Sequence, residues 1–347
     1  MAAAVYRGPA DLVVEQRPVP QPRPGEVLVE VEHCGICGSD LHLVLEGWGR
    51  PGSVEGHEYA GRVVAVGADV VGVSIGDRVV GGPMPRCGRC RHCRAGRPSL
   101  CAERDTPGLA PWQGAFARFT SLPAAQALAV PDGLDLRAAA LAEPLAVALH
   151  AIGQADLLGD ERVLVFGAGP IGALATAALH AAGHNDVRVC EPSPLRQDLA
   201  RRLGAAWVGG PDDLDVPSVA DPGRVVDDPV DVVLECSGHS SAMEAGLAQL
   251  ERGGRLVLVG AGMHFPTFDS NRIVLNELVI TGAFTYDAGG FPTALDLLAS
   301  GRLPLDVLVE PQDVALGGLL AAMRSLAGGE TAGKVLVDPR LEVESDA

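Results

Sequence analysis

Thiol, imidazole and carboxylate side chains are concentrated near the start of this 347-residue sequence. Cys37 precedes the adjacent pair His57 and Glu58, which directly follows Gly56. These side-chain types are zinc ligands, and a catalytic zinc needs only three of them from the protein. We therefore expect Cys37, His57 and Glu58 to surround a catalytic zinc. Glu58 has a second interpretation, in which it supports a ligand without touching the metal.

A second cluster of thiols has the spacing C-x2-C-x2-C-x7-C. It consists of Cys87, Cys90, Cys93 and Cys101. Four thiolates this close together suit the closed, tetrahedral site of a structural zinc. An iron–sulfur cluster also takes four cysteines, and disulfide pairs are a third alternative. We favour the structural zinc, because nothing in the sequence indicates a secreted protein.

A glycine-rich loop follows a continuous apolar run at residues 163–166. The loop has the pattern G-x-G-x-x-G, opens a helical stretch, and is followed about 20 residues later by Glu191. This context predicts a dinucleotide-binding unit, with the pyrophosphate at the helix N-terminus. Glu191 can accept hydrogen bonds from a ribose and would repel a 2′-phosphate, which favours NAD over NADP. The expected cofactor contacts are Gly167, Gly169, Pro170, Ile171, Gly172, Glu191, Cys236, Val259 and Gly260.

Two kinds of structure must position these groups. Up to about residue 135, short strands with Gly and Pro turns predict a barrel-like, all-β domain. Glu143 and Pro144 then precede a helical pattern, in which we expect the proline at the first helical position. From residue 163, strands alternate with helices, and six strands are expected, as in two mononucleotide-binding halves. The tail after residue 284 is too short to fold alone and should pack on the first domain.

Composition narrows the classes of partner. The net charge is −17 and there is no basic run, which argues against nucleic acid or an anionic membrane as a partner. Apolar residues make up 47% of the sequence, as in an ordinary globular protein. The N-terminal residues do not resemble a signal peptide, and no apolar stretch is long enough to span a bilayer. We therefore expect a cytoplasmic protein.

The order of these features resembles the zinc-containing medium-chain alcohol dehydrogenases over nearly the whole chain. The Glu143-Pro144 pair is similar to the sorbitol and threonine dehydrogenase branch. The resemblance implies an α/β fold with a GroES-like catalytic domain at 1–150 and 285–347. A structural zinc lobe is expected at about 84–104, and a Rossmann domain with a doubly wound parallel sheet at 151–284. It also implies a homodimer or homotetramer.

The resemblance assigns roles to individual residues. Cys37 and His57 correspond to the fixed zinc ligands, and Glu58 and Glu143 to the carboxylates that complete the coordination sphere. Ser39 and His42 correspond to a proton relay from the substrate hydroxyl to solvent. With the four clustered cysteines, two zinc ions per chain are expected. The branch implies a polyol, sugar or amino-alcohol substrate.

The expected chemistry is hydride transfer between an alcohol and NAD, with zinc acting as a Lewis acid on the substrate oxygen. Three alternatives stay open. The substrate could be a simple primary, secondary or aromatic alcohol. The chain could bind NAD and zinc without turnover, although all expected ligands and both relay residues are present. A zinc-free quinone or enoyl reductase would leave Cys37, His57 and Glu58 unexplained. Aromatic candidates for the cleft wall, or for the core, are Trp48, Trp112, Phe116, Phe284 and Tyr286.

Overall fold

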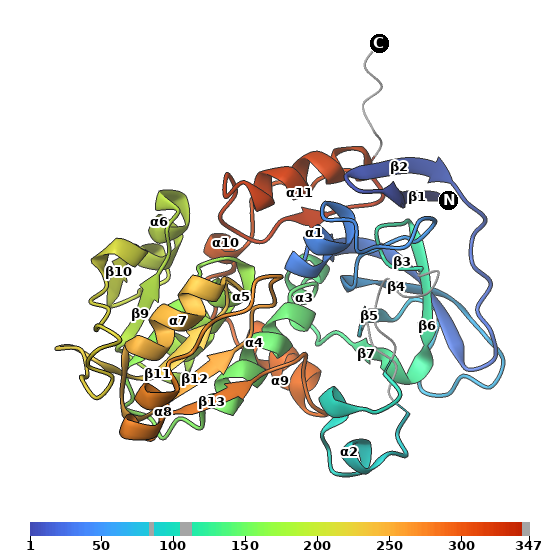
Figure 1. The fold of residues 1–347 in the computed structure, drawn as a ribbon. Coiled ribbons are helices and arrows are strands. Elements are labelled where there is room, and N and C mark those ends of the chain that lie inside the picture. Colours follow the sequence, from blue (N-terminus) through green and yellow to red (C-terminus); the bar gives the residue numbers. More distant parts are fainter. Residues whose placement is uncertain (83–86, 105–112, 342–347) are drawn as a thin grey trace.

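The computed structural model describes residues 1–82, 87–104 and 113–341. Two six-stranded sheets and a small hairpin form its framework (Figure 1). The hairpin pairs β1 (Ala2–Gly8) with β2 (Asp11–Gln16). In the described part of the chain, no helix has the length and hydropathy to cross a bilayer.

The first sheet is antiparallel, and the C-terminal tail completes it. Its central strand β3 (Glu26–Gly35) pairs with β4 (Glu58–Val66), β6 (Phe119–Pro123) and the late strand β14 (Leu336–Val337). Strands β5 (Arg78–Gly81) and β7 (Ala127–Ala129) extend it beyond β4. The return of β14 to β3 agrees with the expected packing of the tail. The domain boundaries themselves stay a prediction.

The second sheet is parallel throughout and contains the six predicted strands. In spatial order these are β10 (Trp207–Gly209), β9 (Val187–Cys190), β8 (Val163–Phe166), β11 (Val230–Glu235), β12 (Leu250–Leu258) and β13 (Val279–Gly282). Counted from β8, the order is 3-2-1-4-5-6, that of a doubly wound sheet whose ligand crevice opens between β8 and β11. The predicted fold class is thus confirmed.

The described residues also contain eleven α-helices, several of which cover the parallel sheet. They are α1 (Gly38–Val44), α2 (Arg91–Arg94), α3 (Leu136–Ala139), α4 (Ala142–Ala155), α5 (Pro170–Ala182), α6 (Pro194–Arg202), α7 (Ser240–Ala248), α8 (Ser270–Asn276), α9 (Gly290–Ala299), α10 (Leu305–Leu308) and α11 (Leu319–Ala327). Helix α4 begins at Ala142, so the prediction that Pro144 takes the first helical position is wrong by two residues. Proline is tolerated there because the N–H groups of a first turn have no intrahelical acceptor.

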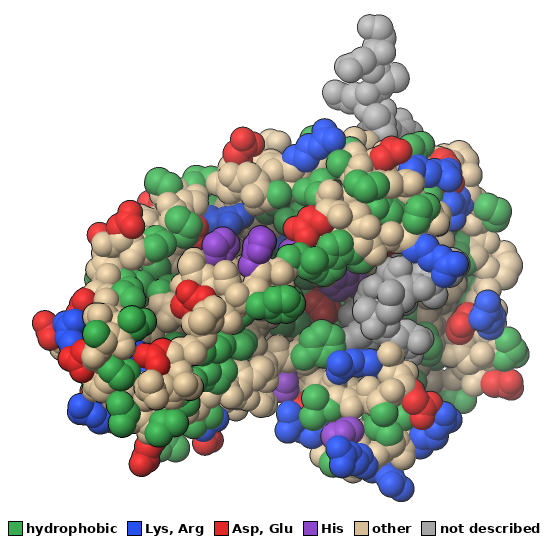
Figure 2. Space-filling view, in the orientation of Figure 1, with side chains coloured by type: hydrophobic (Ala, Val, Ile, Leu, Met, Phe, Trp, Pro, Cys, Tyr) green, Lys and Arg blue, Asp and Glu red, His purple; other side chains and the backbone are tan. Residues whose placement is uncertain are grey.

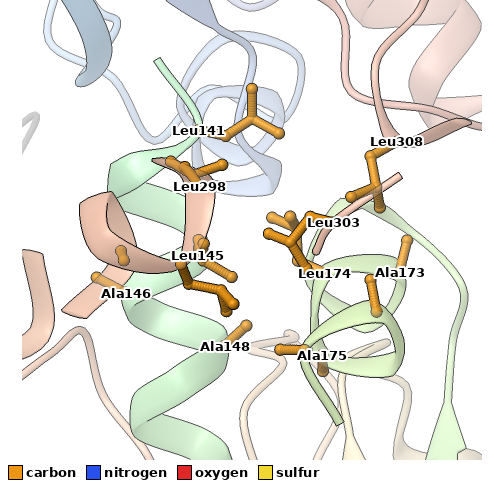
Figure 3. Close-up of a cluster of buried hydrophobic side chains, with 14 of the residues drawn as sticks. Leu141, Leu145, Ala146, Ala148, Ala173, Leu174, Ala175, Leu298, Leu303 and Leu308 are labelled. Atoms are coloured by element: carbon orange, nitrogen blue, oxygen red, sulfur yellow. The ribbon is translucent and has the colours of Figure 1, made fainter. Parts of the chain in front are cut away.

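The largest hydrophobic core lies where α4, α5 and α9 meet. Leu145 of α4, Leu174 of α5 and Leu298 of α9 converge in Figure 3, and each is at most 2% exposed. A fully buried leucine contributes about 1.5–3 kcal/mol relative to an exposed one. This packing fixes α4, which follows the first sheet, against α5, which directly follows the glycine-rich loop.

Candidate active site

Strand pairing brings the first ligand cluster together. Strand β3 ends at Gly35 and β4 begins at Glu58, and these two residues are direct antiparallel partners. Cys37 therefore follows one strand, and His57 precedes its neighbour, at the same end of the sheet. One ligand atom each from Cys37, His57 and Glu58 lies within 4.8 Å of the others. The structure thus assembles the three side chains that the sequence singles out.

Asp40 is a buried carboxylate of this cluster that sequence reasoning missed. The amide of Cys37 donates to its Oδ2 over 2.9 Å, and its Oδ1 lies 3.7 Å from Nδ1 of His57. Burial alone would lower the pKa of His57, but Asp40 and Cys37 outweigh it and raise that pKa well above its usual range. Asp40 therefore lies against both candidate ligands, bonded to the backbone of one and charge-paired with the other. Its signal in the sequence was its place three residues after Cys37, in the first turn of α1.

Lys334 is the second residue that sequence reasoning missed. It arrives on the C-terminal tail, is 2% exposed, and pairs with Oε2 of Glu58. Its Nζ also donates to the carbonyl of Ile36 over 2.8 Å. Burial would lower the pKa of this ammonium, but the charges of Glu58 and Cys37 raise it instead. In the sequence, Lys334 stands out only as a single cation before a short apolar segment, which does not indicate a contact with Glu58.

The charge of the cluster fits a divalent cation. Burial raises the pKa of Glu143 to about 7, and likewise that of Glu55, a further buried carboxylate next to the site. Asp40 Oδ1 and Glu58 Oε1 are buried and accept no hydrogen bond. A surplus of buried, unpartnered carboxylate oxygens beside a thiol and an imidazole suits zinc. Glu143 is buried near this set but is not part of the three-residue group.

The two predicted relay residues lie on α1. Ser39 is exposed and His42 is half-buried, and their i, i+3 spacing places them on one side of the helix. The ring of His42 stacks on Trp48 with 4.9 Å between centroids. Its Nδ1 lies 2.9 Å from Oε1 of Glu46, although without the alignment of a hydrogen bond. The relay role stays a prediction.

The four clustered cysteines also converge. One sulfur from each of Cys87, Cys90, Cys93 and Cys101 lies within 4.8 Å of the others, and all eight cysteines are free thiols. The lobe docks through Ser99, which is 1% exposed and donates from its hydroxyl to Asp287 over 2.6 Å. Arg97 pairs with the same carboxylate at 2.6 Å. Asp287 thereby ties the lobe to the segment that follows β13. Residues 84–86 of the expected lobe lie outside the described residues.

The glycine loop is shaped for a close phosphate. Gly167 has a φ of +87°, which favours glycine, and a Cβ on Gly172 would overlap the Gly167 carbonyl. A Cβ on Gly169, the N-cap of α5, would meet no atom within 4 Å. The helix N-terminus therefore faces open space, as an anion site requires. At the end of β12, a Cβ on Gly260 would overlap the backbone of Gly238.

Glu191 lies at the end of β9 beside this loop and is 4% exposed. Its Oε2 accepts from the amide of Ala168 over 2.7 Å, and its Oε1 from the amide of Ser193 over 2.8 Å. These bonds fix the carboxylate against the glycine loop. Of the other expected contacts, Cys236 directly follows β11 and Val259 directly follows β12, at the carboxyl ends of neighbouring strands.

The aromatic candidates divide by burial. Phe116 and Tyr286 are buried, whereas Trp48 and Phe284 are exposed, with Arg104 over the Phe284 ring at 4.5 Å. Trp112 lies outside the described residues. Figure 2 shows a hollow between the two halves of the molecule, in which acidic and histidine side chains are visible.

Comparison with known proteins agrees with this architecture. Residues 23–132 match the family model of the alcohol dehydrogenase GroES-like domain, and residues 170–300 that of the zinc-binding dehydrogenases. The chain is 34% identical to sorbitol dehydrogenase from Bacillus subtilis, in an alignment that covers 90% of each protein. It is 36% identical to L-threonine 3-dehydrogenase from Streptomyces avermitilis, over 92% of this chain and 94% of that one.

Solved structures give the same result. The crystal structure of 2R,3R-butanediol dehydrogenase from Bacillus subtilis has a TM-score of 0.86 and 32% identity, covering 98% of this chain and 99% of that one. A putative zinc-binding dehydrogenase from Sinorhizobium meliloti bound to NADP has a TM-score of 0.85 and 29% identity, covering 97% and 99%. The chain therefore belongs to the zinc-dependent medium-chain alcohol dehydrogenases, NAD(P)-dependent oxidoreductases that act on CH–OH groups, in the branch of the sorbitol and threonine dehydrogenases.

Proposed function

We propose that this enzyme oxidises a hydroxyl of a polyol, sugar or amino alcohol with NAD, at a zinc held by Cys37, His57 and Glu58. The observation that carries the proposal is the convergence of these three ligand types within 4.8 Å. The four cysteines of the docked lobe would hold a second, structural zinc. Glu143 is close enough to influence the charge of the first site, and we assign it as a carboxylate that completes the sphere.

The zinc, when bound, would supply Lewis-acid polarisation of the substrate hydroxyl. The chain's own residues then have distinct tasks. Asp40 holds Cys37 and His57 in place. Ser39 accepts the hydroxyl proton and His42, on the same side of α1, passes it towards solvent. The glycine loop and Glu191 place the hydride acceptor at the carboxyl ends of the parallel strands.

The preference for NAD over NADP rests on charge at the ribose site. Glu191 presents a fixed, buried carboxylate beside the loop. Of the arginines that could offset a 2′-phosphate, Arg196 donates instead to the carbonyl of Leu326 over 2.9 Å. Arg201 and Arg202 are exposed at the far end of α6. This arrangement favours a free 2′-hydroxyl.

The substrate class follows from the relatives. Their names cover sorbitol, threonine and butanediol, each of which carries a hydroxyl next to a second polar group. The test is a panel of polyols, sugar alcohols, amino alcohols and simple primary, secondary and aromatic alcohols, assayed for NAD reduction. Turnover highest with vicinal diols or amino alcohols supports the proposal. Turnover confined to simple primary or aromatic alcohols contradicts it.

We also propose a homodimer or homotetramer, to be tested by sedimentation velocity; a sedimentation coefficient of a single chain contradicts it. A cytoplasmic location belongs to the same proposal, because eight free thiols suit a reducing compartment.

A further inference from the structure

Lys334 is the only lysine in the sequence, which contains 26 arginines. Its side chain is among the largest that are fully buried in the described part of the molecule. Burying a cation is costly unless it is paired. The chain uses arginine at every other strongly basic side chain, and it places its one lysine ammonium beside Cys37, His57 and Glu58.

The backbone fixes Lys334 from two sides. Its amide donates to the carbonyl of Leu308 over 2.8 Å, and its own carbonyl accepts from the amide of Glu310 over 2.9 Å. On the other side, the amide of Ile36 donates to the carbonyl of Val335 over 3.1 Å. The tail therefore delivers the lysine to one place, directly behind the loop that carries Cys37.

The space around the ammonium is also specific. A Cβ on Gly35 would lie 2.8 Å from Cε of Lys334 and would overlap the carboxylate of Glu58. Gly35 thus makes room for the ion pair between the two side chains. A compact ammonium suits this space better than a broad, planar guanidinium.

We propose that Lys334 is a positioning residue that holds one oxygen of Glu58 and keeps this carboxylate a displaceable zinc ligand. The inference rests on the proposed function, because it assumes zinc at Cys37 and His57. A fixed ammonium and a metal compete for the same carboxylate, and the two cations repel each other. With zinc bound, Glu58 would then have a second cationic partner in Lys334, so giving up its place at the metal would not leave it as an unpaired buried charge.

Competition predicts the sign of the effect of a mutation. In Lys334→Met the carboxylate has only the metal as a cationic partner, so zinc should be held more tightly. If Lys334 had only a structural role, its replacement would loosen the site, and zinc would be released faster. The rate of zinc release to a colorimetric chelator distinguishes the two roles, and the rate of release from the four-cysteine site serves as the internal reference.

We expect release of the zinc at Cys37 and His57 to slow at least about 10-fold in Lys334→Met. Removing a residue behind metal ligands usually weakens metal binding by about 10- to 100-fold, so the predicted change has that size but the opposite sign. In the Glu58→Gln background the same substitution should cause no slowing, because the shared carboxylate is gone. Arg340→Met is the matched control, since that cation pairs with Glu32 and Asp338 instead. Unchanged or faster release in Lys334→Met overturns the proposal.

A second measurement uses the intact protein, in case Lys334→Met does not fold. Growth on lysine labelled with ¹⁵N at Nζ gives one side-chain ammonium signal, because the chain has one lysine. Removal of the zinc at Cys37 and His57 should shift this signal, since Glu58 then belongs to the ammonium alone. A signal that does not change contradicts the proposal. If metal analysis finds no zinc beyond the four-cysteine site, the proposed function itself fails, which is a separate result.

Discussion

Replacing Glu191 with alanine should reverse the cofactor preference. In the wild type, this carboxylate is fixed by the amides of Ala168 and Ser193 and is 4% exposed. A hydrogen bond to a charged acceptor contributes about 1.5–3 kcal/mol. Loss of the acceptor for the adenosine ribose should therefore raise the Kd for NAD about 10- to 150-fold.

The same charge opposes NADP. Two unit charges about 5 Å apart repel each other by roughly 3 kcal/mol at an effective dielectric constant of about 20, which corresponds to a preference on the order of 100-fold for NAD. Glu191→Ala removes this repulsion, so the Kd for NADP should fall or stay constant while that for NAD rises.

The assay is isothermal titration of each cofactor into wild type and variant. The informative quantity is the ratio of the two Kd values, because any loosening of the glycine loop affects both cofactors alike. Glu277→Gln, an exposed glutamate at the end of α8, is the control and should change neither value. A wild type that binds NADP as tightly as NAD, or a ratio that Glu191→Ala leaves unchanged, would refute the role of this carboxylate.

Three further predictions concern the supporting structure. Asp40→Asn should weaken zinc binding about 10- to 100-fold, because it removes the charge that orients the neighbouring ligands; competition with a chelator measures this, and unchanged affinity argues against the orienting role. Gly35→Ala should cost about 1–3 kcal/mol of stability by overpacking against Glu58, seen as a lower Tm; an unchanged Tm contradicts the close packing. Burial would raise the pKa of Asp313, but His33 and Arg137 outweigh it and lower that pKa. Its ionised form thus stabilises the fold at neutral pH, and this contribution should disappear as the pH falls below about 4, through the lowered pKa. In urea unfolding from pH 3 to 6, the free energy of unfolding should fall less steeply with acid in Asp313→Asn than in wild type. If the two proteins lose the same free energy of unfolding between pH 6 and pH 3, the stabilising role of the ionised Asp313 is contradicted.

Local patterns were sufficient to predict the framework of the molecule. The apolar runs between 163 and 281 predict the six parallel strands, because strands buried on both faces read as continuous hydrophobic segments. The spacing of Cys37, His57 and Glu58 indicated a site that a single strand pair then assembles. The start of α4 was misplaced by two residues, since proline is compatible with several positions of a first turn.

Residues that act through distant contacts could not be predicted in the same way. Lys334 contacts Ile36 across 298 positions of sequence, and no local pattern specifies that pairing. Glu55 gives no periodic signal either, and its backbone is held by a distant segment, through the amide of Phe116 that donates to the Glu55 carbonyl. Both are consequences of how the chain returns to the first sheet.

Zinc content and activity of Cys37→Ser, measured together, test the central claim most directly. The wild type should contain about two zinc ions per chain, one for each ligand set, and should oxidise an alcohol with NAD. Cys37→Ser should retain about one zinc, at the four cysteines, and lose turnover while still binding NAD. Full activity in a protein without zinc, or two zinc ions and undiminished turnover in Cys37→Ser, would contradict a catalytic zinc at this site.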